Sequence, residues 1–168
     1  DVCRFIFLMK TAQAQFDFDL DAVQKQSKEN PVFYFQYGHA RCASILKKAI
    51  EKGAEFVGLA GLTDAQLSRL VLPEEKAMLK KISQLPDVVA SAAEKLEPHH
   101  VLYFCQELIG DFHSYYTQYK SDPIVSGDVD KTQGRLALVA ALKQTLISSF
   151  GILGIAAPEH MEAPTEEE

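Results

Sequence analysis

Apolar residues recur at intervals of three and four along most of the chain, which predicts helices. The first ten residues already follow this spacing, with apolar side chains at Val2, Phe5, Ile6 and Met9. Residues 15–21, QFDFDLD, alternate instead and suggest a short extended piece, and a short helix is expected over residues 21–28. One alternating stretch cannot build a sheet. The predicted fold class is therefore all-α, a helical bundle.

Proline, glycine and capping residues set the expected helix boundaries. Asn30 can cap a helix that begins at Pro31, runs to about Lys52 and ends at Gly53. Thr63 is a plausible cap for the short segment DAQLSRL. Further helices are expected in LPEEKAMLKKISQL, in LPDVVASAAEKL, from Pro98 to about Lys120, and over residues 131–150. These boundaries predict a junction segment over residues 1–30, a helical domain over 31–161 and an acidic, disordered tail over 162–168.

The helix that begins at Pro31 carries more aromatic residues than one buried face requires. Its predicted core face contains Val32, Phe35, His39, Cys42, Ala43, Leu46, Ala49 and Ile50. A second line of residues beside this face contains Tyr34, Tyr37, Arg41, Ser44, Lys48 and Lys52. Rings followed by cations suit single-stranded RNA, whose bases stack on rings while lysines meet phosphates. The alternative is that the tyrosines cover a neighbouring helix and the cations are only solvated.

The long helix from Pro98 repeats this arrangement. Its core positions are Val101, Cys105, Leu108, Ile109 and Phe112, and its end reads FHSYYTQYK. Near that end, His113, Tyr116 and Lys120 share one face. A histidine in such a position is more often packed or solvated than catalytic.

Charge and cysteine content limit the function classes. The net charge is −6, but four of the 23 acidic residues lie in the last seven positions, so the remainder carries 19 acidic and 17 basic residues. A nearly neutral body can bind RNA only through a local basic surface. Cys3, Cys42 and Cys105 form no CxxC pair, which predicts unpaired, buried thiols and a cytoplasmic protein. We find no apolar run long enough to span a bilayer and expect no membrane partner and no DNA partner.

Catalytic and metal-binding patterns are missing from the sequence. No nucleophile–histidine–acid spacing and no glycine-rich phosphate loop is present. Asp17, Asp19 and Asp21 lack the glycine and the closing glutamate of an EF-hand loop. We therefore expect no catalytic residue, no metal site and no cofactor bound by this chain.

The order of several motifs resembles a known family. VFYFQYGHARCASILKKA follows DVCRFIFLMK…DFDLD, and it is followed by AAEKLEPHHVLYFCQELIGDFHSYY and by RLALVAALKQTLISSFGILGIAAPEHM. From Asp1 to Met161 the chain is similar to the C-terminal part of bacterial arginyl-tRNA synthetases. In that family of class I ligases, the all-helical DALR domain binds the anticodon.

The resemblance implies a site. The tyrosine and arginine of the QY-x-H-x-R block fall on Tyr37 and Arg41, the later aromatic on Tyr116, and the chain-terminal methionine on Met161, although EAPTEEE continues beyond it here. Bases would stack on the tyrosines while Arg41 makes charge-assisted contacts. The full set of expected tRNA-binding residues is Tyr34, Tyr37, Arg41, Lys48, Tyr116, Lys120 and Met161, and Lys47 and Lys52 would also meet phosphates. His39 belongs to the motif, but its position on the helix predicts a core role.

The resemblance also implies partners. These are the anticodon stem-loop of tRNA(Arg) and a catalytic domain of the same polypeptide, which would precede Asp1, carry HIGH-like and KMSK-like motifs and use ATP and Mg²⁺. This chain lacks those motifs, so by itself it should be inactive. The alternative is a free-standing helical interaction module with the same fold and no ligase role. The gene sequence upstream of Asp1 distinguishes the two.

Overall fold

The computed structural model describes residues 1–11 and 30–162, and all regular structure in these two ranges is helical. The expected extended piece, the expected helix over 21–28 and most of the acidic tail lie outside the described residues. The elements are α1 (Val2–Met9), α3 (Pro31–Glu51), the 3₁₀ turn η1 (Leu59–Gly61), α4 (Asp64–Leu67), α5 (Pro73–Ser83), α6 (Leu85–Lys95), α7 (His99–Gln118) and α8 (Val129–Leu153). The predicted all-α bundle is confirmed.

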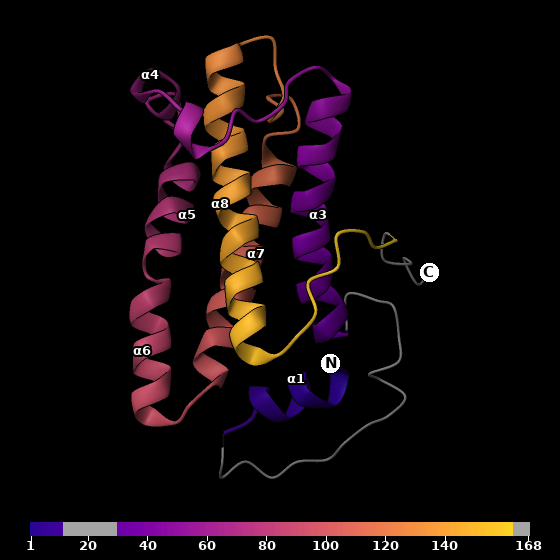
Figure 1. Cartoon of the computed structure of the whole chain (residues 1–168), viewed down its shortest axis with the longest axis vertical. Coiled ribbons are helices and arrows are strands. Elements are labelled where there is room, and N and C mark those ends of the chain that lie inside the picture. The colour runs from indigo at the N-terminus through magenta and orange to yellow at the C-terminus, as the bar shows by residue number, and fades with distance from the viewer. Residues whose placement is uncertain (12–29, 163–168) are drawn as a thin grey trace.

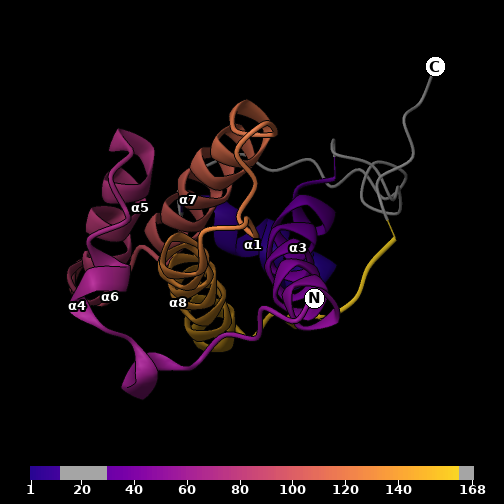
Figure 2. The ribbon, with the colours of Figure 1, turned by 90° about the horizontal axis from the view of Figure 1, so that it is seen from above.

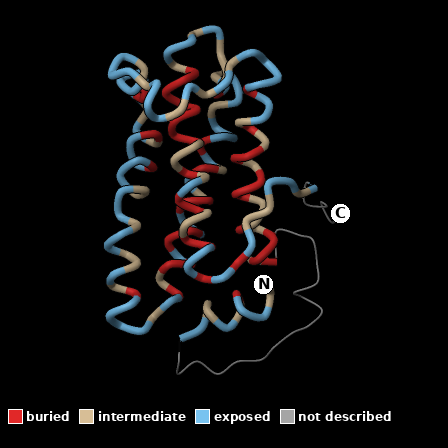
Figure 3. The backbone as a smooth tube through the Cα atoms, in the orientation of Figure 1, coloured by how far each residue is buried: buried red, intermediate tan, exposed pale blue. Residues whose placement is uncertain are grey.

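Helices α7 and α8 form the centre of the bundle, and α7 contacts α1, α3, α5, α6 and α8. Helix α8 packs against α3, α4, α5 and α7, while α5 and α6 form one long outer column beside α7 (Figures 1 and 2). Buried positions follow the inward sides of α3, α7 and α8, whereas the outer column is mostly exposed (Figure 3). Helix α1 lies across the end of the bundle where α8 ends (Figure 1). The core therefore runs along the length of the three longest helices.

The composition of α8 corrects one expectation. Over Val129–Leu153 this helix is long and apolar enough to cross a membrane by length and composition, so the prediction that no such run exists is wrong. More than half of its most apolar window, 56%, is buried within the bundle. An enclosed core helix needs apolar residues on most of its sides, which is why its composition approaches that of a membrane span.

Local signals place the helix ends. The Asn30 side chain accepts a hydrogen bond from Val32 N at 3.1 Å, and Thr63 forms a capping box with Gln66. Gly53, which follows α3, has φ +72°, a conformation that glycine adopts without a steric penalty. Helix α8 is longer than predicted at both ends, because the Asp128 carboxylate accepts from Lys131 N and the helix stops only at the left-handed Gly154. 

The close approach of α3 to α7 depends on one small residue. A Cβ atom built on Gly38 would lie 2.9 Å from Ile109 Cγ1, so a larger side chain would push the helices apart. This contact brings Tyr37 and Arg41 of α3 next to the last turns of α7. Two predicted core residues of α3 are not in the core, because Leu46 is half-buried and Ile50 is 55% exposed.

The burial of α3 also exceeds the predicted stripe. The additional buried positions are Phe33, Gly38, Ala40 and Ile45. They are covered because α3 contacts α7 and α8 on two different sides. The predicted core positions of the helix from Pro98 are all buried. Of the cysteines, Cys42 and Cys105 are buried, and burial raises the pKa of the Cys42 thiol to about 12, but Cys3 is exposed, against the prediction.

A buried ion pair joins α5 to α8. Arg135 Nε donates to Glu75 Oε1 at 2.8 Å, and the two side chains are only 1% and 0% exposed. The same carboxylate accepts from Tyr115 Oη at 2.9 Å and from Leu72 N at 3.0 Å. Arg135 Nη2 also donates to Asp122 Oδ2 at 2.9 Å. This network fixes the loop that follows α7 against α5 and α8.

Candidate nucleic-acid interface

Two tyrosine rings and one guanidinium form the centre of the candidate site. Arg41 Cζ lies 5.0 Å from the centroid of the Tyr37 ring and 5.3 Å from that of Tyr116. Arg41 Nη2 also donates a hydrogen bond to Tyr37 Oη at 3.2 Å. Tyr37 and Arg41 are one turn apart on α3, while Tyr116 comes from the last turns of α7. Both rings are thus close enough to share one planar cation between them.

The rings of Tyr37 and Tyr116 each pack against another aromatic ring, and each is partly exposed to solvent. Tyr37 stacks on Phe33 with centroids 6.0 Å apart, and its edge meets the His113 ring at 6.1 Å. Tyr116 leans on Phe112 and is 38% exposed, whereas Tyr37 is half-buried. Aromatic support on one side fixes each ring plane and leaves part of the other side accessible.

A hollow of about 240 Å³, the aromatic hollow, opens beside this stack. It is lined by Tyr37, Ala40, Arg41, Ser44, Ile45, Lys48, Tyr116, His160 and Met161. Of the residues expected at the site, Tyr37, Arg41, Lys48, Tyr116 and Met161 are therefore brought together. Lys48 is exposed and supplies a flexible cation at the rim.

A second hollow of about 290 Å³, the lysine hollow, shares Ile45, Lys48 and Tyr116 with the first. Its other lining residues are Lys52, Tyr115, Tyr119, Lys120, Asp122, Pro123, Ile124 and Val125. Three lysines thus surround an apolar and aromatic floor. The expected phosphate contacts Lys48 and Lys52 lie around this hollow together with Lys120, which was expected to bind tRNA, whereas Lys47 is exposed but lines neither hollow.

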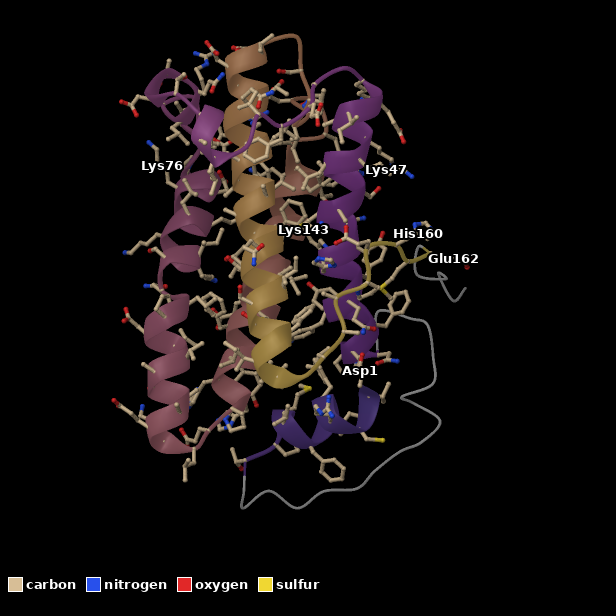
Figure 4. The ribbon with its side chains drawn as sticks, viewed as in Figure 1. Asp1, Lys47, Lys76, Lys143, His160 and Glu162 are labelled. Atoms are coloured by element: carbon tan, nitrogen blue, oxygen red, sulfur yellow. The ribbon has the colours of Figure 1, made fainter. Side chains whose placement is uncertain are left out.

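The C-terminal segment, residues 155–161, runs back along α3 and ends at the aromatic hollow (Figures 1 and 4). Gly154 reverses the chain with φ +66°. Gln36 Nε2 then donates to Ala156 O at 3.1 Å, and the His39 ring bonds to Pro158 O through Nδ1 at 2.9 Å. Because a carbonyl only accepts, Nδ1 of His39 carries the proton.

Charged side chains also hold the C-terminal segment against α3 and α8. Lys143 of α8 donates to Glu159 at 2.7 Å, and Glu159 Oε1 lies 3.9 Å from His39 Nε2. His39 is fully buried, and burial is the main cause that lowers its pKa, with the Glu159 carboxylate opposing the shift. Figure 4 shows Lys143 between α8 and the segment, with His160 further along beside α3. The predicted core position of His39 is confirmed, and its polar edge holds the segment.

Tyr34 lies apart from the other expected site residues. Its ring packs edge-on against His113 at 5.4 Å, and its hydroxyl oxygen lies 3.9 Å from where a Cβ of Gly110 would be. Burial raises the pKa of this phenol, and the charge of Arg41 opposes the shift. Tyr34 therefore covers α7, as the alternative interpretation of the tyrosines proposed, and it lines neither hollow.

Several residues that build the site were not predicted. Gln36, His39 and Lys143 position the C-terminal segment, and His160 lines the aromatic hollow. The pairing of α3 with a segment more than one hundred residues later has no signature in local spacing. The terminal methionine was the only available pointer to it.

Comparison with known proteins places this geometry in a family. Residues 35–161 match the DALR anticodon binding domain. The chain is 47% identical over 167 residues to the arginine–tRNA ligase of Anaeromyxobacter sp. (strain Fw109-5), covering 98% of this chain and 27% of the relative. It is 43% identical over 161 residues to that of Syntrophotalea carbinolica, covering 96% of this chain and 28% of the relative.

Structural similarity agrees with the sequence match. The Thermus thermophilus arginyl-tRNA synthetase superposes with a TM-score of 0.74 at 27% identity, covering 95% of this chain and 26% of that protein. The chain thus spans about a quarter of the length of the relatives it matches. The family match covers all of the aromatic hollow. The chain belongs to the DALR anticodon-binding domain family.

Proposed function

We propose that this chain is the anticodon-binding part of an arginine–tRNA ligase and that its aromatic hollow receives unpaired bases of the tRNA(Arg) anticodon loop. The observation that carries the proposal is the sharing of one guanidinium by two half-open tyrosine rings. Ring faces and guanidinium planes are the surfaces on which splayed RNA bases stack. Family membership and the ligase names of the relatives favour this function over a free-standing interaction module.

The chemistry of binding follows from the groups present. A base entering the aromatic hollow would stack on Tyr37 or Tyr116, while the guanidinium of Arg41 would turn to an acceptor on a base or phosphate. Lys48, Lys52 and Lys120 surround the adjacent lysine hollow and would meet the backbone. With a net charge of −6 for the whole chain, this local cluster must supply most of the phosphate attraction.

In the full-length protein, binding here would hold tRNA(Arg) while a preceding catalytic domain joins arginine to it, using ATP and Mg²⁺. The chain described here would contribute position and selectivity and no chemical step. A cytoplasmic location is inferred from the same role. HIGH-like and KMSK-like motifs upstream of Asp1 are a requirement of this proposal, and their absence from the gene would refute it.

The binding test is a titration of the 168-residue chain with an arginine anticodon stem-loop RNA and with a stem-loop altered at its middle base. Stacking is worth about 1–3 kcal/mol per base, so Tyr37→Ala and Tyr116→Ala should each raise Kd by roughly 5-fold to 150-fold. Added salt should also weaken binding. Tyr103→Ala is the matched control, because Tyr103 is 41% exposed but lies near the other end of α7.

Two results would count against the proposal. Equal affinity for both stem-loops would remove the claim of base selectivity. A loss with Tyr103→Ala as large as the loss with Tyr37→Ala would show that binding does not depend on the aromatic hollow.

A further inference from the structure

Three potential metal ligands meet at the turn between α6 and α7, far from the aromatic hollow. One ligand atom from each of Glu97, His99 and His100 lies within 4.8 Å of the other two. His100 Nε2 is 2.8 Å from Glu97 Oε2, and the centroids of the two imidazole rings are 4.4 Å apart. The three side chains therefore already converge on a common point.

His99 is the unusual member of this group. It is only 6% exposed, and within residues 1–11 and 30–162 its ring nitrogens make no hydrogen bond. Its ring is packed between His100 and Tyr103, the latter with centroids 5.5 Å apart. Because no described side chain or backbone group bonds to this ring, a lone pair of His99 is available to a metal ion without breaking an existing hydrogen bond.

We propose that Glu97, His99 and His100 bind a divalent transition-metal ion of the zinc type. Two imidazoles and one carboxylate form a donor set that suits Zn²⁺ better than Mg²⁺ or Ca²⁺, which prefer oxygen ligands alone. Three protein ligands leave a fourth position for water. The site is distinct from the CxxC and EF-hand spacings whose absence led us to expect no metal.

The existing geometry requires only small adjustments. Ligand atoms of a tetrahedral zinc ion with bonds of 2.0–2.1 Å are about 3.3 Å apart. The contact between Glu97 and His100 must widen slightly, and His99 must move closer, which side-chain rotation can supply. The first turn of a helix disfavours a cation, because its N–H groups point outward. The Glu97 carboxylate offsets this effect, and we expect modest, micromolar affinity.

Metal binding would stabilise the turn into α7. Leu96, directly before the site, adopts a left-handed conformation with φ 58° and is 87% exposed. Backbone hydrogen bonds from Leu96 N to Ala93 O at 3.3 Å and from Glu97 N to Ala92 O at 2.9 Å close this turn. A metal ion would add a side-chain link from Glu97 to the first helical residues. His99 and Tyr116 are seventeen residues apart on one helix, or about 26 Å at 1.5 Å per residue, so RNA binding and metal binding can be tested separately.

The experiment uses the untagged 168-residue chain with Cys3→Ser, because the exposed Cys3 thiol could itself bind zinc. Calorimetric titration with Zn²⁺ alone should give one equivalent bound. Removal of one ligand should weaken binding at least 10-fold, since even groups that only support a ligand contribute that much. We therefore expect His99→Ala, His100→Ala and Glu97→Gln each to raise Kd by this factor. Glu94→Gln, which removes an exposed carboxylate one turn earlier on α6, should not.

A second measurement does not depend on the variants folding. Co²⁺ added to the Cys3→Ser chain should broaden the NMR signals of residues 97–100 first, without a thiolate charge-transfer band. The proposal is overturned if no saturable binding occurs at millimolar Zn²⁺, if both histidine variants bind as before, or if the broadening is centred elsewhere.

Discussion

Replacing Glu75 by leucine should strongly destabilise the bundle. The change removes a fully buried carboxylate that accepts three hydrogen bonds, from Arg135 Nε, Tyr115 Oη and Leu72 N, at 2.8, 2.9 and 3.0 Å. The guanidinium of Arg135, 1% exposed, would then keep its charge without its buried partner. The structure therefore predicts a larger loss than for an exposed ion pair.

The magnitude can be bounded. Removing one partner of a buried ion pair lowers the free energy of unfolding by roughly 3–5 kcal/mol. Arg135 retains Asp122 Oδ2 at 2.9 Å, but that carboxylate is 39% exposed and compensates only in part. We therefore expect a loss near the lower end, about 3 kcal/mol. This is a large part of the roughly 5–15 kcal/mol by which single domains are stable.

The assay is urea unfolding followed by far-ultraviolet circular dichroism, with the free energy of unfolding obtained by linear extrapolation. Glu94→Leu is the matched control, because it makes the same change at an exposed helical position and should shift stability by no more than about 0.5 kcal/mol. The double variant Glu75→Leu with Arg135→Met should lose much less than the sum of the two single losses.

Two outcomes would refute this reasoning. A loss below about 1 kcal/mol for Glu75→Leu would mean that the ion pair adds little once desolvation is counted. Additive losses in the double variant would show that the residues stabilise the bundle independently, through packing.

Three further predictions concern other parts of the bundle. Gly134→Ala should destabilise by about 1–3 kcal/mol, because its Cβ would clash with the backbone oxygen of Gln66, whereas the control Gly151→Ala meets nothing within 4 Å. Both are measured by urea unfolding. Hydrogen bonds from Arg135 and Lys131 lower the pKa of Asp122 to about 2, so the stability it contributes is present above about pH 4 and lost as the pH falls through 2. Unfolding of Asp122→Asn should lack this decline, and an unchanged pH profile would contradict the assignment. His39→Ala removes the hydrogen bond to Pro158 O in the C-terminal segment. Hydrogen exchange of the amides of residues 156–161 should therefore become faster, with the free energy of local opening lower by about 1–3 kcal/mol. Unchanged exchange would show that other contacts hold the segment.

Helix positions could be predicted because their signals are local. Asn30, Pro31 and Thr63 mark helix starts through their own side chains, and Gly53 marks an end through its φ angle. The extent of α8 was underestimated, since its cap Asp128 lies within a segment of mixed turn residues. Burial at Ile45 depended on which neighbours α3 meets, and helical spacing does not contain that information.

The site was predictable only in part. Helical spacing placed Tyr37 and Arg41 on one line, the family resemblance pointed to both and to Tyr116, and the structure brings the three together. Tyr34 was expected beside Tyr37, but the structure packs its ring against His113 of α7 and outside both hollows, because residues three apart on a helix can face different neighbours when the helix contacts two others. The network of Glu75 was not found, since its members are separated by up to sixty residues and each resembles an ordinary surface residue in the sequence.

Arg41 contacts both tyrosine rings of the candidate site. Its guanidinium lies 5.0 Å from one ring centroid and 5.3 Å from the other, so each ring already has a planar cation as its neighbour. Under the proposed function, an incoming base must displace the guanidinium of Arg41 from a tyrosine ring before it can stack there. The net affinity is then the free energy of stacking the base on a tyrosine minus that of the arginine–tyrosine contact that it replaces. A nucleotide that offers the displaced guanidinium a hydrogen-bond acceptor therefore binds more tightly. Discrimination between nucleotides can therefore arise from the competition between the base and Arg41 for the rings, as well as from direct contacts with base edges.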